Sequence, residues 1–230
     1  MPAMDARRWS GLTEFGWVTL ALLTVALAWD ASGLDMAFAH LAGGPGGFPW
    51  RDNWVLAVVF HEGARRFAWV VALGICLAVW WPLGPLARIG QRDRLQLAAS
   101  TLLGALAVSV LKAGSHTSCP WELSDFGGLA QYASHWSLAS DGGAGRCFPA
   151  GHAASGFTFV GGYFAFRTTS PRLARAWLAA ALGAGILLGL AQQWRGAHFM
   201  SHTLWSAVVC WGVACLLHAA WPRTWSAEGT

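Results

Sequence analysis

Three separated segments of the chain each bring a basic or imidazole side chain to the end of an apolar stretch. Lys112 ends one stretch, His152 begins another in FPAGHAASG, and QQWRGAHFMSH carries Arg195, His198 and His202 ahead of a third. Ionisable groups at the ends of apolar helices are energetically expensive, which makes each of them a candidate for function. Cations and imidazoles collected at one place suit an anion, and a phosphate group above all.

Imidazole also supplies the chemistry for a reaction at phosphorus. It is nucleophilic when neutral and donates a proton when charged, and its reference pKa of about 6.5 allows both roles near neutrality. Lys112, with the backbone N–H groups of Gly151 and His152 at the start of a helix, would hold the phosphoryl oxygens.

The composition identifies the elements that must position these residues. Of the 230 residues, 55% are hydrophobic and 11% are charged, whereas an ordinary soluble domain has about 25% charged residues. This excludes a disordered, coiled-coil or collagen-like chain and indicates an integral membrane protein. The net charge of +4 does not indicate a nucleic-acid partner, because Lys112 is the only lysine and the arginines are scattered between apolar blocks.

We predict one all-α membrane domain over residues 1–230. Six apolar stretches are long enough, or nearly so, for a hydrocarbon core that needs about 20 helical residues. These expected spans are 11–29, 67–86, 95–111, 151–166, 176–194 and 203–221. Residues 52–67 have helical spacing with an apolar and a charged face, which predicts a helix along the outer membrane surface. The connection 112–150 is expected to be a long outer loop that carries part of the site.

The placement of basic residues predicts the orientation. One set of loops holds Arg7, Arg8, Arg88, Arg92, Arg94, Arg167, Arg172, Arg175 and Arg223. The opposite set holds Arg51, Arg65, Arg66, Lys112, Arg146 and Arg195, together with most of the acidic residues. The positive-inside rule then places both termini in the cytoplasm and the candidate site on the outer side.

The order and spacing of the polar segments resemble the type-2 phosphatidic acid phosphatase superfamily. Its three motifs read K-x-x-x-x-x-x-R-P, P-S-G-H and S-R-x-x-x-x-x-H-x-x-x-D. This chain has Lys112 followed after six residues by Cys119-Pro120, then Pro149-Ala150-Gly151-His152, then His198 followed four residues later by His202. The resemblance covers about residues 110 to 205, and the six expected spans extend it to the whole chain, as a bacterial membrane branch with divergent motifs.

The resemblance implies a role for each matched residue. His198 would attack phosphorus and become a phosphohistidine, and His152 would protonate the leaving oxygen. Lys112 and Gly151 would bind the phosphoryl group. The resemblance implies no metal and no cofactor.

The motifs also depart from the superfamily pattern at four positions. Cys119 replaces an arginine, Ala150 replaces a serine, Gln192 stands where the third motif has its arginine, and His202 replaces the aspartate that orients the nucleophile.

Other residues could take over these lost functions. We expect Arg195, with Arg146, to replace the missing guanidinium groups. His202 lies four residues after His198, on the same helical face, and could orient it as a neutral acceptor. Glu122 or Asp125 could supply the lost negative charge.

The sequence therefore predicts a membrane phosphatase for a lipid-linked phosphate or diphosphate whose head group lies outside. Undecaprenyl diphosphate, lipid A phosphates, phosphatidylglycerol phosphate and phosphatidic acid are candidate substrates, and the bacterial inner membrane, with the site facing the periplasm, is the expected location. Two alternatives are a lipid phosphotransferase and a catalytically degenerate protein that binds or transports phospholipid. A third is a metal site at His198 and His202, completed by His152 or His116. The retention of His198, His152 and Lys112 favours an enzyme.

Two of the five cysteines, Cys119 and Cys147, are expected on the outer side, whereas the other three lie within apolar spans. The periplasm is oxidising, so we expect these two to form a disulfide that closes the 112–150 loop and draws Lys112 towards His152. The alternative is a pair of free thiols.

Overall fold

The computed structural model describes residues 6–221, with their side chains from Phe15 onward. The side chains of Arg7, Arg8 and Arg223, three of the basic residues on the expected cytoplasmic side, lie outside this described part.

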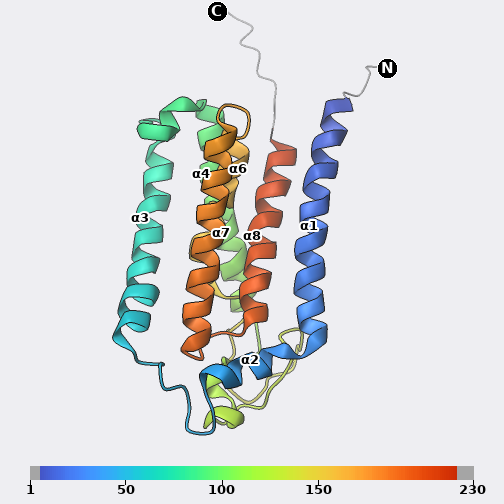
Figure 1. Ribbon diagram of the computed structural model, residues 1–230, viewed down its shortest axis with the longest axis vertical. Helices are drawn as coiled ribbons and strands as arrows, with labels where there is room; N and C mark the ends of the chain where they lie inside the picture. The colour runs from blue at the N-terminus through green and yellow to red at the C-terminus, as the bar shows by residue number, and fades with distance from the viewer. Residues whose placement is uncertain (1–5, 222–230) are drawn as a thin grey trace, which may run out of the picture.

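The described chain forms a bundle of helices without β-strands (Figure 1). Its α-helices are α1 (Ala6–Ser32), α2 (Leu34–Ala42), α3 (Ala64–Leu77), α4 (Gln91–Ala113), α5 (Gly151–Phe157), α6 (Gly161–Phe166), α7 (Pro171–Trp194) and α8 (Met200–Ala220). The π-helix η1 (Val55–Gly63) and the 3₁₀ turns η2 (Gly84–Arg88), η3 (Pro120–Glu122), η4 (Ser124–Phe126) and η5 (Thr158–Val160) complete the helical elements.

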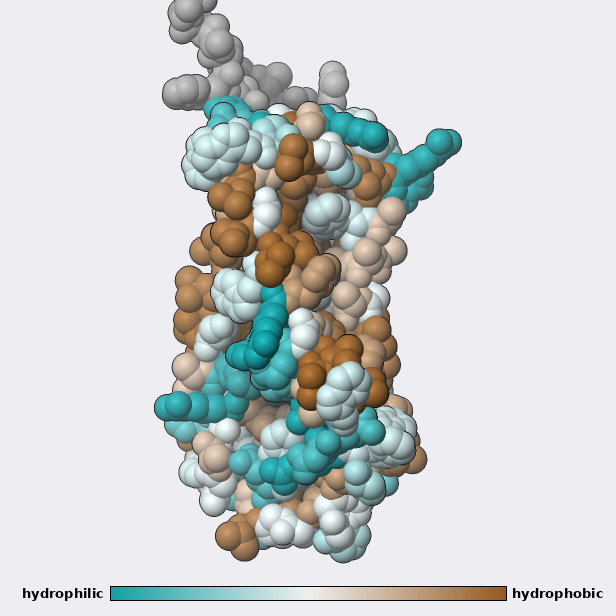
Figure 2. All heavy atoms as spheres, turned by 90° about the vertical axis from the view of Figure 1, so that its left-hand side faces the viewer, coloured by the Kyte–Doolittle hydropathy of each residue, from teal (hydrophilic) through white to brown (hydrophobic). Residues whose placement is uncertain are grey.

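Four of these helices are long and apolar enough to cross a membrane. The apolar spans are Phe15–Ser32 of α1 and the whole of α4, α7 and α8. Large hydrophobic side chains also lie exposed along α3, at Phe67, Trp69, Val70 and Leu73, and hydrophobic residues cover much of that face of the molecule (Figure 2). An apolar exterior of this kind is suited to lipid, so the chain is a membrane protein.

The predicted count of six spans is not confirmed, because the second and fourth expected spans differ from long apolar helices. Residues 151–166 are helical as expected, but α5, η5 and α6 divide them into three short pieces. The second expected span, 67–86, ends as a regular helix at Leu77. Pro82 follows closely, and proline disfavours helix in the residue before it.

The surface helix expected over residues 52–67 is not a separate element. Gly63 and Ala64, at the junction of η1 and α3, both have right-handed helical backbone angles. The two segments therefore continue as one rod that stands along the bundle (Figure 1). Neither residue provides a cap that would end the first helix, and amphipathic spacing alone does not distinguish a surface helix from one that packs against a bundle.

Small residues allow the helices that carry the site to approach closely. A Cβ atom added to Gly156 of α5 would overlap the backbone nitrogen of Gly185 in α7, and one added to Gly185 would overlap the ring of Phe157. Close backbone approach at small residues is typical of helix packing in membranes. This contact holds α5, with His152 in its first turn, against α7.

We predict that Gly185→Ala destabilises the protein by about 1–3 kcal/mol, because the added methyl group meets the fully buried ring of Phe157. Gly183→Ala is the matched control on the same helix, since a Cβ atom there has nothing within 4 Å. Thermal unfolding in detergent would show a lower midpoint for the first variant only. Equal midpoints for the two variants would contradict the packing described here.

Candidate active site

The three polar segments meet at one end of the bundle. The end of α4, the start of α5 and the turn between α7 and α8 lie together, opposite the start of α1 and the end of α8 (Figure 1). The charges of Lys112, His152 and His202 all act on His198. The structure therefore brings together the lysine and the three histidines that the sequence singled out.

A tight turn between α7 and α8 delivers His198. Gly196 has a left-handed φ of 76°, a conformation that glycine adopts without strain. The Gly196 N–H donates to the Gln193 carbonyl over 2.9 Å, and the Ala197 N–H donates to the Gln192 carbonyl over 2.9 Å. These bonds end α7 and set the direction in which the chain enters His198.

The His198 imidazole is buried and lies against a second imidazole. Its side chain is 4% exposed, and its Nδ1 atom lies 3.3 Å from Nδ1 of His202. Burial, together with the positive charge of Lys112, holds the pKa of His198 well below its usual value of 6.5, and a proton on a neighbouring histidine would lower it further. The ring is therefore neutral at neutral pH. In the tautomer whose Nδ1–H donates to His202, Nε2 carries the lone pair that can meet a phosphate.

His152 lies in the first turn of α5, directly after Gly151. Its Nε2 atom is buried and has no hydrogen-bond partner among the described residues. The ring stacks on His61 of η1, with 3.9 Å between the ring centroids. A buried polar atom without a partner costs free energy, so Nε2 of His152 is available for a ligand.

Arg195 is present in the site, but its guanidinium is already partly engaged. Nε donates to the Arg51 carbonyl over 2.8 Å, and Nη1 donates to Oε1 of Gln192 over 3.0 Å. Gln192, at the position of the superfamily arginine, thus holds the arginine that lies three residues later. The charge of Arg195 acts on His61 and His152, so its guanidinium lies near the histidine in the first turn of α5.

The side chains of three other sequence candidates are exposed or bonded elsewhere. Arg146 is exposed, and its backbone N–H donates to the Ser115 carbonyl over 2.9 Å. Glu122 accepts a hydrogen bond from the Cys119 backbone N–H over 2.8 Å, and Asp125 is exposed. Within the described part of the chain, no hydrogen bond or ion pair joins these three side chains to His198 or His202.

The structure contains a disulfide between Cys119 and Cys147, whose Cα atoms are 5.2 Å apart. It ties the segment after α4 to the segment before α5. Sγ of Cys147 also lies 3.2 Å from the Ala197 carbonyl oxygen and 3.5 Å from Nδ1 of His198; because a disulfide sulfur carries no hydrogen, these are packing contacts. The bond therefore forms part of the wall behind the candidate nucleophile.

The same three side chains are the potential metal ligands found within the described residues. The ligand atoms of Cys119, Cys147 and His198 lie within 4.8 Å of one another. Two of them are the bonded sulfurs, which offer no thiolate for a metal. His116, one of the residues that could have completed a metal site with His198 and His202, is exposed.

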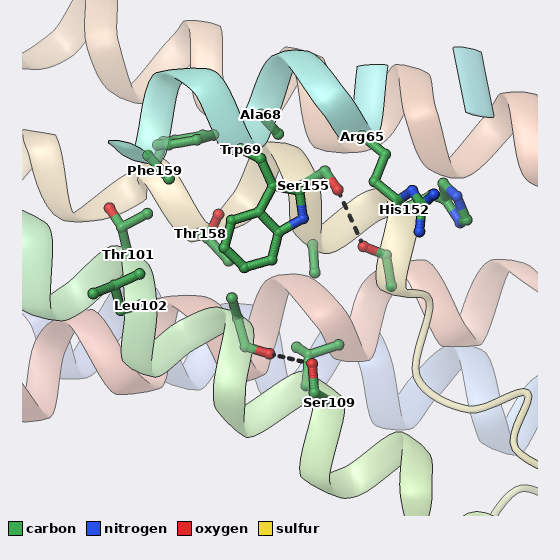
Figure 3. Close-up of a pocket in the computed structure, with 15 residues that line it drawn as sticks. Arg65, Ala68, Trp69, Thr101, Leu102, Ser109, His152, Ser155, Thr158 and Phe159 are labelled. Atoms are coloured by element: carbon green, nitrogen blue, oxygen red, sulfur yellow. Dashed lines mark hydrogen bonds between the residues drawn. The ribbon is translucent and has the colours of Figure 1, made fainter. Parts of the chain in front are cut away.

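A cavity of about 220 Å³ reaches His152 and lies between α3, α4 and α5. Figure 3 shows Arg65 and His152 at one end of it and Thr101 and Leu102 at the other, with Trp69 between them. Most of its lining is apolar. Sequence reasoning did not identify His61 and Arg65 as parts of the site, because they belong to the segment that was expected to lie on the membrane surface.

These observations define a class of protein: a helical membrane bundle with paired histidines and cations at one end. A profile of the PAP2 superfamily matches residues 94–226, which is more than half of the chain. No curated protein and no solved structure matches this chain. The chain belongs to the PAP2 superfamily, whose members are phosphatases acting on phosphate esters, and this confirms the resemblance seen in the motifs.

We predict that the protein isolated without reductant carries the Cys119–Cys147 bond. Mass spectrometry after alkylation should find these two cysteines linked and unmodified, whereas a reduced sample should be alkylated at both. Replacing both by serine should lower the free energy of unfolding by about 3–4 kcal/mol, since the bond closes a loop with a sequence separation of 28. Alkylation of both outer cysteines without reduction would contradict the pairing.

Proposed function

We propose that this chain is a phosphatase for a lipid-linked phosphate, acting at the outer surface of a bacterial inner membrane. The observation that carries the proposal is the position of His152. Its imidazole belongs to the polar cluster around His198 and also lines the end of the apolar cavity between α3, α4 and α5. A substrate with a phosphate head and an apolar chain fits both environments at once.

The reaction proceeds in two steps at one phosphorus atom. In the first, Nε2 of His198 attacks phosphorus, the bond from phosphorus to the lipid oxygen breaks, and His152 donates a proton to that oxygen. In the second, water attacks the phosphohistidine, His152 takes a proton from the water, and the P–N bond breaks to release phosphate. The phosphoryl group thus moves from lipid to enzyme to water, and the proton that His152 gives in the first step returns to it in the second.

The cations stabilise the phosphoryl oxygens during both steps. Lys112 projects from the last turn of α4 and is partly buried, and Arg195 is fixed by Gln192 and the Arg51 carbonyl. Fixed positive groups in a partly dry site stabilise the charge that develops on the transferring group. The backbone N–H of Gly151 is a further donor in this proposal.

We predict that His198→Ala abolishes turnover, with a loss of at least roughly 10³-fold, because no other group replaces the attacking nitrogen. Acid-labile phosphate should be trapped on the wild-type protein after quenching, and not on the variant. His116→Ala is the control, since that histidine is exposed in the outer loop. The assay uses purified protein in vesicles with a panel of lipid phosphates. Full activity of His198→Ala would rule out this nucleophile.

The pH dependence of the first step gives an independent measurement. Protonation of Nε2 removes the attacking lone pair, and burial moves the pKa of His198 downward. Phosphorylation by nitrophenyl phosphate, which needs no acid for its leaving group, should therefore not slow between pH 7 and pH 6.

Addition of EDTA should leave the rate unchanged. A strict metal requirement would favour the metal site at His198 and His202 instead.

We predict that His152→Ala slows hydrolysis of alkyl phosphates by about 10²- to 10⁴-fold and that of nitrophenyl phosphate far less, because only an alkoxide needs protonation as it leaves. Parallel rate measurements with the two esters provide the comparison. Equal losses on both would mean that His152 binds phosphate without acting as an acid. Transfer of the phosphoryl group to a lipid acceptor, rather than to water, would identify a phosphotransferase.

A further inference from the structure

The third motif lacks the carboxylate that the superfamily pattern has beside its nucleophile, since His202 occupies that position. The acids that the sequence suggested as substitutes, Glu122 and Asp125, do not contact His198 or His202 in the described structure. An imidazole that accepts a phosphoryl group gains positive charge and must keep its orientation while it does so. The residues that hold the start of α8 could therefore provide this orientation.

A buried carboxylate from α2 binds the first turn of α8. Asp35 is 7% exposed, and its Oδ1 atom accepts hydrogen bonds from the Ser201 backbone N–H over 3.0 Å and from Nε1 of Trp29 over 2.7 Å. Its Oδ2 atom accepts a further hydrogen bond from the Ser201 hydroxyl. Ser201 lies three residues after His198 and immediately before His202.

This arrangement caps α8 from outside the helix. The first N–H groups of a helix have no partner within it, and a side chain at the N-cap residue commonly accepts one of them. The N-cap residue of α8 is Phe199, which forms no side-chain cap. Asp35 takes this role from another element, and its negative charge lies at the helix end where an anion is favourable.

A second acid of the same corner holds the next turn of α8. Oδ2 of Asp30 accepts hydrogen bonds from Nε1 of Trp205 over 2.9 Å and from Nε1 of Trp136 over 3.0 Å. It also lies 3.3 Å from Nε2 of His135, whose ring meets the His202 ring edge-on with 5.8 Å between centroids. Asp30 thus supports the wall on the far side of His202.

We propose that Asp35 is the positioning residue for the nucleophile, in place of the aspartate missing from the third motif. By fixing Ser201 it sets the first turn of α8, and with it the contact between His198 and His202. The same turn is tied to the general acid, because the Ala150 N–H donates to the His202 carbonyl over 3.2 Å at the start of α5. Asp35 lies outside residues 94–226, so the matched part of the chain does not contain this function. The inference rests on the proposed phosphatase activity.

The test compares Asp35→Asn with the wild type in full-length protein in vesicles. We expect kcat to fall about 10- to 100-fold, since small displacements of a reacting group have effects of that size, while KM changes less than about twofold. Asp125→Asn, which removes an exposed carboxylate from the outer loop, should leave both constants unchanged. A role limited to stability would instead reduce the amount of folded protein and leave kcat per folded molecule intact, which would overturn the inference.

Ser201→Ala provides a second variant, which keeps the backbone N–H and loses only the hydroxyl. It should lower kcat less than Asp35→Asn does, and the double variant should lose less than the product of the two single losses, because both act through one contact. A loss of kcat in the double variant equal to the product of the two single losses would overturn the inference.

Hydrogen exchange of the segment 199–203 separates failure of the inference from failure of the proposed function. Asp35→Asn should speed exchange there whether or not a substrate is turned over. If the wild type is inactive on every lipid tested, the phosphatase proposal fails, and unchanged exchange would overturn the positioning role as well. If the wild type is active and Asp35→Asn retains its kcat, only the inference fails.

Discussion

The contact between the Nδ1 atoms of His198 and His202, 3.3 Å apart in a buried site, constrains everything around it. Two imidazolium rings could not lie this close without strong repulsion, so one Nδ1 carries a hydrogen and the other accepts it. The arrangement requires the turn at Gly196, the sulfur of Cys147 behind the ring and a rigid first turn of α8. The first and the last of these flank His198 in the sequence, whereas Cys147 lies 51 residues before it.

A membrane protein could be predicted from composition, because 11% charged residues cannot cover a water-facing surface. Its all-helical fold could be predicted from the length of the apolar stretches. The course of residues 52–86 could not. Amphipathic spacing is compatible with a helix on a membrane and with one packed in a bundle. The helical backbone at Gly63, which joins η1 to α3, is not indicated by any pattern in the sequence. The element η1 is a π-helix, a rare conformation that the spacing of apolar residues does not distinguish from an α-helix.

The candidate site divides along the same line. Lys112, His152, His198 and Arg195 were predicted because each lies in a short motif at the end of an apolar stretch, where an ionisable residue is unexpected. Arg146 was predicted by residue type alone, and its side chain is exposed in the structure. Asp35 and His61 carry no local signal, since the contacts that tie them to the site are far away in the sequence, at Ser201 and His152. Only the folded chain brings those pairs together.

In this site the carboxylate lies at the start of α8 and a histidine lies beside the candidate nucleophile. This arrangement affects the pKa of His198. A carboxylate in direct contact with His198 would raise the pKa of that imidazole, whereas a neutral imidazole there does not. Burial and the charge of Lys112 then keep His198 unprotonated. Asp35 is stabilised by three hydrogen bonds and by the positive end of a helix, which offset the cost of burying its charge. The divergent third motif can thus keep a neutral nucleophile in place, while the negative charge of Asp35 lies against Ser201, the residue before His202.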